Sequence, residues 1–160
     1  MRTAAFLLVA LRLCAQQFPV LEGQNLLDKK VKFPDGNAAV VVMGFTHASQ
    51  NQTKAWSQRL KGQFPVYSIA VLEDVPRLVR GMASHGIKSG VPADQRDHFL
   101  LVYHGEKELK QAADFSTADD AYVLVLDQAG AIRWKFHGPV TDAAMEQVKE
   151  AWGRPGGPPH

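Results

Sequence analysis

Cysteine is almost absent from this sequence. The only one in 160 residues is Cys14, which lies in an apolar N-terminal segment. A thiolate is the nucleophile in disulfide exchange and in cysteine-based peroxide reduction. Once residues 1–15 are removed, the remaining chain can therefore carry out neither thiol–disulfide nor peroxidase chemistry.

Apolar runs of the length that a membrane-spanning helix needs are missing from the sequence. Met1-Arg2 gives a positive start, an apolar run from Ala4 to Ala10 continues towards Ala15, and Gln16-Gln17 ends it. This layout predicts a signal peptide over residues 1–15, with a run too short to span a bilayer. We expect an exported protein, periplasmic or extracellular, without a transmembrane span after signal removal. The alternatives are a retained or lipid anchor at this end, or an N-terminal helix of a cytoplasmic protein.

A net charge is missing from the mature chain as well. The full sequence holds 18 Lys plus Arg and 16 Asp plus Glu; removal of Arg2 and Arg12 leaves 16 of each sign. Neither a glycine-rich phosphate loop nor basic residues interleaved with aromatic ones are present. The composition of the mature chain therefore gives no electrostatic reason to expect a nucleic-acid partner.

The elements that are present alternate between strand and helix patterns. We expect a small hairpin over 24–33, strands at 38–45, 66–72 and 99–103, helices at 51–60, 74–86, 106–113 and 142–152, and a closing hairpin over 121–136. Strands that alternate with helices predict an α/β fold, a mixed β-sheet flanked by helices. The domain spans 16–152, and the Pro- and Gly-rich tail 153–160 is expected to be disordered.

Several apolar positions are predicted to form the core. Leu78, Val79 and Met82 space as one face of the helix that begins near Asp74. Trp56 shares a helical face with Leu60. Three side chains alternate on the last strand and are expected to share one buried face: Ile132, Trp134 and Phe136.

Two segments resemble the redoxin branch of the thioredoxin-like superfamily, which includes peroxiredoxins and copper-chaperone-like proteins. Gly44-Phe45-Thr46-His47 is similar to the start of a redoxin active-site loop, and 121–138 is similar to the redoxin hairpin with its Asp-x-x-Gly turn. The resemblance covers about residues 20–152 and implies a thioredoxin-like fold with an N-terminal hairpin.

The sequence departs from that family at the positions of the reactive cysteines and of the cis-proline. Ala48 and Gln52 stand at the two cysteine positions of copper-chaperone-like redoxins, and Ser49 stands at the peroxidatic position of peroxiredoxins. Ala121 replaces the cis-proline that faces the active cysteines in the family. No catalytic residue is carried over to this chain.

A narrower match is to the redox-inactive, thioredoxin-like assembly factor of mitochondrial ATP synthase. It rests on the pattern Ala-Tyr-Val-x-x-x-Asp that begins at Ala121, on Ile132-Arg133-Trp134 and on Gly138. This resemblance implies a chaperone for a membrane subunit. We interpret the chain as a redox-inactive exported binding, chaperone or assembly module with a protein partner, a subunit of a membrane complex, and without a cofactor.

The candidate binding residues lie at the degenerate redox loop and opposite it: Thr46, His47, Ser49, Gln50, Asn51 and Asp120. One alternative is an enzyme that uses a site around His47 and Ser49, because a serine beside a base can act as a nucleophile. Another is a copper-handling redoxin relative with ligands among His47, His98, His104 and His137, of which the last three lie at strand ends. We expect no metal site, because the histidines lack zinc-ligand spacing and no thiolate remains.

The N-terminal prediction can be checked on protein purified from its source. Intact-mass measurement should find a chain that begins at Gln16 and does not react with thiol reagents. A purified chain that retains Cys14 would contradict cleavage.

Overall fold

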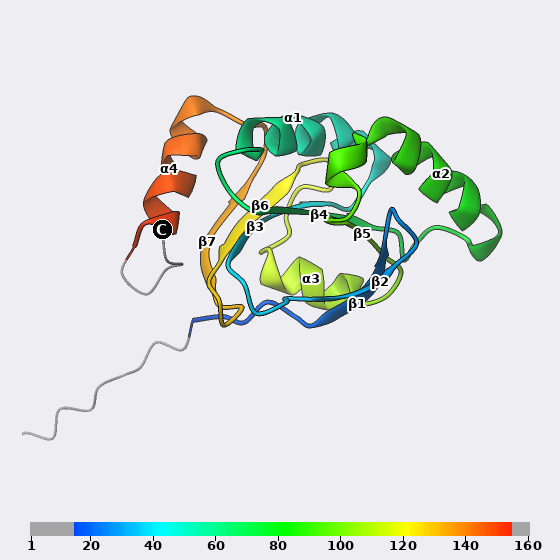
Figure 1. Cartoon of the computed structure of the whole chain (residues 1–160), viewed down its shortest axis with the longest axis horizontal. Coiled ribbons are helices and arrows are strands. Elements are labelled where there is room, and N and C mark those ends of the chain that lie inside the picture. The colour runs from blue at the N-terminus through cyan, green and yellow to red at the C-terminus, as the bar shows by residue number, and fades with distance from the viewer. Residues whose placement is uncertain (1–14, 155–160) are drawn as a thin grey trace, which may run out of the picture.

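A computed structural model describes residues 15–154 of the chain. In it one mixed sheet of seven strands runs in the order β2-β1-β5-β4-β3-β6-β7 (Figure 1). The neighbours β3, β4 and β5 are parallel, whereas β1, β2, β6 and β7 pair antiparallel. This architecture confirms the expected mixed α/β sheet and its N-terminal hairpin.

The elements follow the predicted order closely. Their bounds are β1 Leu21–Asn25, β2 Lys30–Phe33, β3 Ala39–Gly44, η1 His47–Ser49, α1 Gln50–Leu60, β4 Val66–Val71, η2 Arg77–Val79, α2 Arg80–Gly90, η3 Ala93–Gln95, β5 Phe99–Val102, α3 Glu106–Ala112, β6 Tyr122–Leu126, β7 Ile132–His137 and α4 Asp142–Trp152.

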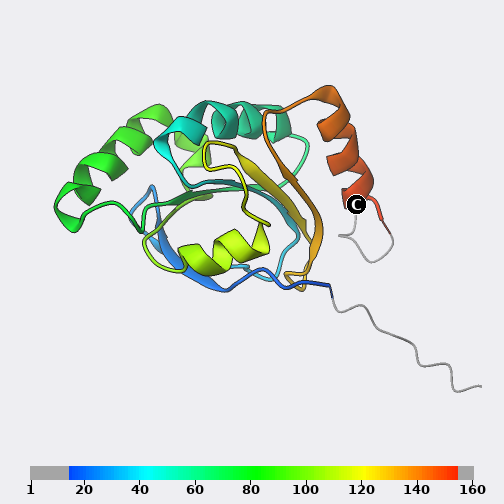
Figure 2. The same cartoon turned by 180° about the vertical axis from the view of Figure 1, so that it is seen from behind.

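The sheet separates two apolar layers, because successive side chains of a strand point to opposite faces. Val40 and Val42 of β3 pack with Trp56 of α1 and Met145 of α4 on one face. The other face carries a cluster around Val41, with residues of α3 and of the β1–β2 hairpin. Figures 1 and 2 show α1 and α2 on one side of the sheet and α3 on the other. The central strands β3 and β6 are therefore apolar on both faces, as a continuous hydrophobic run predicts.

The closing hairpin is held by one buried carboxylate. Asp127 accepts hydrogen bonds from the backbone N–H groups of Ala129 and Ala131, both at 2.9 Å, and from Arg133 Nε at 2.8 Å. Gly130 has φ +76°, a conformation that favours glycine. These contacts explain why the turn reads Asp-x-x-Gly.

The last strand differs from its predicted pattern. Leu126 pairs with Ile132 but Val125 pairs with Trp134, so a bulge shifts the register between β6 and β7. Ile132 therefore joins the α3-side cluster, while Trp134 and Phe136 pack half-buried against the α1- and α4-side cluster. The prediction that these three share one buried face is wrong. Trp56 is fully buried, as expected.

The second helix also differs. It begins at Arg80 after a short 3-10 turn and continues through Gly86 to Gly90. The side chains of Leu78 and Met82 are 98% and 78% exposed, so the predicted core face points to solvent. A periodic apolar pattern identifies a helix face but does not fix the side on which the rest of the protein lies.

Two sequence predictions fall largely outside the described residues. These are the signal peptide over 1–15, of which only Ala15 is described, and the tail 153–160, of which Gly153 and Arg154 are described. Within residues 15–154, the helices are all too short or too polar to cross a bilayer.

Replacement of Asp127 tests the hairpin. Asp127→Ala should lower the free energy of unfolding by about 2–4 kcal/mol, because it leaves the buried Ala131 N–H without its acceptor and Arg133 without this carboxylate. Urea denaturation measures the change. The free energy of unfolding of Asp127→Asn should lie between those of the wild type and of Asp127→Ala. Asp94→Ala removes an exposed carboxylate that pairs with Lys61 and should have little effect. Equal effects of Asp127→Ala and Asp94→Ala would contradict this role.

Candidate functional site

The loop after β3 is closed by its own side chains. Thr46 caps η1, since its Oγ1 accepts from the Ser49 N–H at 3.3 Å. Ser49 is 1% exposed, and its hydroxyl donates to the Thr46 carbonyl oxygen at 2.8 Å. A Cβ atom on Gly44 would lie 2.5 Å from Ser49 Oγ, so only glycine fits beside this serine. Ser49 therefore works as a packed turn residue, with its hydroxyl proton already committed.

Gln52 connects this loop to the segment before β6. Its Oε1 accepts from the Ala121 backbone N–H at 2.9 Å, and its Nε2 donates to Asp120 Oδ1 at 3.2 Å. Thr46 makes a second connection, because its hydroxyl lies 3.0 Å from Asp119 Oδ1 and 3.3 Å from the Ala118 carbonyl oxygen. The side chain at the second cysteine position thus bridges to the position of the family's cis-proline.

Asp120 is held from a third segment as well. His137, at the end of β7, places Nδ1 2.9 Å from Asp120 Oδ2. This hydrogen bond, aided by the one from Gln52, lowers the pKa of Asp120 below its ordinary value. The carboxylate is therefore ionised at neutral pH, and the His137 ring donates to it. We call the five residues that meet here the polar junction: Thr46, Gln52, Asp119, Asp120 and His137.

The structure brings together only part of the predicted site. Thr46 and Asp120 meet in the polar junction, and Ser49 lies buried beneath the loop. His47, Gln50 and Asn51 are exposed, and their side chains have no hydrogen-bond or ion-pair partner within the described part of the chain. Of the six predicted site residues, these three therefore have side chains that are free to contact another molecule.

Two contributors to this site were not among the predicted residues. In the sequence, Gln52 stands at a cysteine position of the family and His137 stands at the end of a strand. Both are recruited by contacts between segments far apart in sequence, 69 residues for Gln52 and Ala121. The one signal in the sequence is Gln52, because its amide can both donate and accept hydrogen bonds and it stands at a cysteine position of the family. The cis peptide bond found in residues 15–154 is Phe33–Pro34, distant in sequence from Tyr122.

The histidines considered as metal ligands are dispersed. His98 precedes β5 and stacks on Tyr67 at 4.4 Å between ring centroids, whereas His104 follows β5. His137 is engaged with Asp120. Over residues 15–154 the structure contains no group of three His, Cys, Asp or Glu side chains placed to hold a metal ion.

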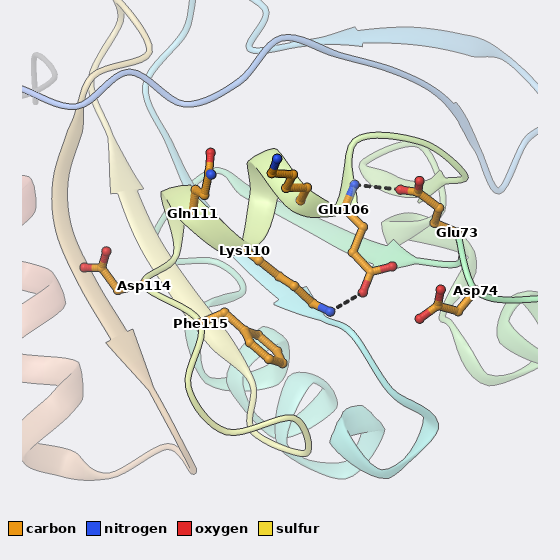
Figure 3. Close-up of a pocket in the computed structure, with 8 residues that line it drawn as sticks. Glu73, Asp74, Glu106, Lys110, Gln111, Asp114 and Phe115 are labelled. Carbon is orange, nitrogen blue, oxygen red and sulfur yellow. Dashed lines mark hydrogen bonds and ion pairs between the residues drawn. The ribbon is translucent and has the colours of Figure 1, made fainter.

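A shallow groove of about 700 Å³ lies beside α3, near the carboxyl ends of β4 and β5 (Figure 3). Glu73 accepts from the Glu106 backbone N–H at 2.8 Å, and Lys110 pairs with Glu106 at 2.5 Å. Lys110 also lies over Phe115, 4.6 Å from the ring centroid. Phe115 packs on Phe45, which directly precedes Thr46. The groove therefore adjoins the loop of the polar junction through an aromatic contact.

Comparison with known proteins supports the resemblance first seen in the sequence. The family model described as ATP10 protein matches residues 13–153. A search of curated protein sequences finds no match.

Solved structures show the same fold at low sequence identity. The exposed lipoprotein thioredoxin Etrx1 from Streptococcus pneumoniae has a TM-score of 0.56 at 12% identity, over 82% of this chain and 99% of that one. BsSco, a member of the Sco family of cytochrome c oxidase assembly proteins, has a TM-score of 0.56 at 13% identity, over 86% and 94%. The thio-disulfide isomerase from Thermus thermophilus has a TM-score of 0.56 at 16% identity, over 88% and 97%. The chain therefore has a thioredoxin-like fold, which confirms the predicted fold class.

The hydrogen bond between His137 and Asp120 predicts a pH effect. Because the pKa of Asp120 is lower in the folded than in the unfolded chain, ionised Asp120 stabilises the fold above its unfolded pKa. That stabilisation is lost as the pH falls through the folded pKa. NMR titration of the Asp120 carboxyl carbon should show a higher pKa in His137→Ala than in the wild type. An unchanged pKa in that variant would show that His137 does not hold the carboxylate.

Proposed function

The chain belongs to the ATP10 protein family, and from this premise we propose that it is a redox-inactive, thioredoxin-like assembly module. It would bind a subunit of a membrane complex, ATP synthase, and hold that subunit during assembly. The observation that carries the proposal is the polar junction. At the end of the fold where redoxins exchange electrons, this chain places Gln52 hydrogen-bonded to Ala121 and Asp120.

The junction favours binding over catalysis for two reasons. The Ser49 hydroxyl donates a hydrogen bond to the Thr46 carbonyl oxygen and is closed off from solvent. The Asp120 carboxylate is fixed by two partners, His137 and Gln52, so it is not placed as a free base. What remains accessible is a rigid loop with polar side chains on its surface.

We propose that the partner contacts His47, Gln50 and Asn51, which are exposed on this loop. The neighbouring groove beside α3 would extend the contact, because Phe45 and Phe115 join the two surfaces. Export, predicted from residues 1–15, is part of the same proposal, and it would place the chain on the outer side of the membrane that holds its partner.

Complementation tests this function in cells that lack the protein. Native gels should show a deficit of assembled ATP synthase, and the wild-type chain should restore it. A triple variant, His47→Ala with Gln50→Ala and Asn51→Ala, should restore assembly about tenfold less well, because it removes the accessible polar contacts without touching the core.

The matched control is Gln147→Ala, an exposed polar residue of α4, which should restore assembly fully. Thermal melting of the triple variant should match that of the wild type, since its three side chains are exposed. Normal assembly in cells that lack the protein would refute the function. Full restoration by the triple variant would refute the proposed contact surface.

A further inference from the structure

The segment 77–90, formed by η2 and α2, has its apolar side chains on the outside. Leu78 is 98%, Met82 78% and Val79 42% exposed. Neither η2 nor α2 contains a buried residue. An ordinary surface helix turns its apolar face to the core, so the exposure of these three side chains departs from the usual pattern.

The side of α2 that faces the protein is mixed in polarity, because its half-buried residues include Ala83, Ser84, Ile87 and Lys88. Gly81, Ser84, His85 and Lys88 line a cavity of about 260 Å³ between α2 and the N-terminal hairpin. Lys88 lies 3.6 Å from Asp28 of that hairpin. A rotation of α2 that turned Leu78 and Met82 towards the protein would place these apolar side chains over the cavity. It would also turn Ser84 and Lys88, which line the cavity, towards solvent. The outward direction of the apolar side chains is therefore consistent with the surface that α2 covers.

The same segment is basic. No acidic residue lies between Asp74 and Asp94, whereas the stretch contains Arg77, Arg80 and Lys88. Arg80 is engaged, because its guanidinium donates to the Val75 and Glu73 carbonyl oxygens. Arg77 is exposed beside Leu78 and has no ion-pair partner within residues 15–154. Exposed apolar side chains next to a cation match the interface of an anionic bilayer.

The position of the segment favours a membrane over a partner helix. Figures 1 and 2 show α2 projecting at one corner of the molecule, beyond the edge of the sheet. A projecting corner can enter the headgroup layer of a bilayer while the rest of the fold stays outside it. The cavity next to α2 lies on its inner side, away from the exposed apolar side chains.

We infer that the segment 77–90 binds the surface of an anionic phospholipid membrane, with Leu78, Val79 and Met82 inserted among the headgroups and Arg77 at the phosphates. This inference concerns a surface distinct from the polar junction. Its test uses purified protein and vesicles, so it can fail while the proposed function stands.

Co-sedimentation with phosphatidylcholine vesicles that contain phosphatidylglycerol tests the inference on the full chain. The double variant Leu78→Ser with Met82→Ser should reduce the partition coefficient by at least about tenfold. Arg77→Glu should reduce it about five- to tenfold on these vesicles and much less on pure phosphatidylcholine. Hydrogen exchange should slow in 77–90 when the anionic vesicles are added.

Two matched controls lie on other surfaces. Val20→Ser removes a 65% exposed apolar side chain, and Lys107→Glu reverses an exposed charge on α3, across the sheet. Both should bind as the wild type does. The apolar N-terminal run is present in every variant and cannot create a difference among them.

Two results would overturn the inference. In one, the wild type and the double variant bind vesicles equally. In the other, the wild type does not bind vesicles but sediments as a dimer that the double variant loses, which would make this face a contact between two copies of the chain. Unchanged thermal melting of all variants ensures that either result reports on binding and not on unfolding.

Discussion

The loop after β3 is joined to the segment before β6 by one side chain, Gln52, which connects two parts of the chain 69 residues apart. Its amide oxygen accepts from the Ala121 N–H and its amide nitrogen donates to Asp120. An amide can satisfy a donor and an acceptor at once, which a thiol does only weakly. Copper-chaperone-like redoxins have a cysteine at this position, whereas this chain has an amide that joins two segments by hydrogen bonds.

The other contacts at this end follow from that connection. With Asp120 positioned by Gln52, His137 can reach it from β7, and the carboxylate carries a lowered pKa. Thr46 ties the preceding loop to Asp119. A network in which the polar groups satisfy one another is rigid, and it presents His47 and Asn51 to solvent on a fixed loop. The residues that stand at the second cysteine position and at the cis-proline position of redoxins thus take part in hydrogen bonds that hold the loop in place.

Features decided by neighbouring residues could be predicted from the sequence. The apolar run of β3 indicated a strand buried on both faces, and the spacing of Asp127 and Gly130 indicated the closing turn, which the buried carboxylate explains. Features decided by distant contacts could not. The bulge in β7 moves Ile132 to the other face of the sheet. The partnership of His137 with Asp120 depends on strand pairing that no local pattern reveals. The exposure of Leu78 depends on which side of the segment packs against distant parts of the chain, and local periodicity does not reveal that.

Neither the polar junction with its loop nor the apolar corner of α2 contains a cysteine. The most direct measurement is therefore made with Cys14→Ser, which removes the single thiol of the chain. In cells that lack the protein, this variant should restore the amount of assembled ATP synthase to the wild-type level. Failure of Cys14→Ser to restore assembly, while the variant accumulates normally and is processed at the same residue, would show that function requires sulfur and would contradict the account.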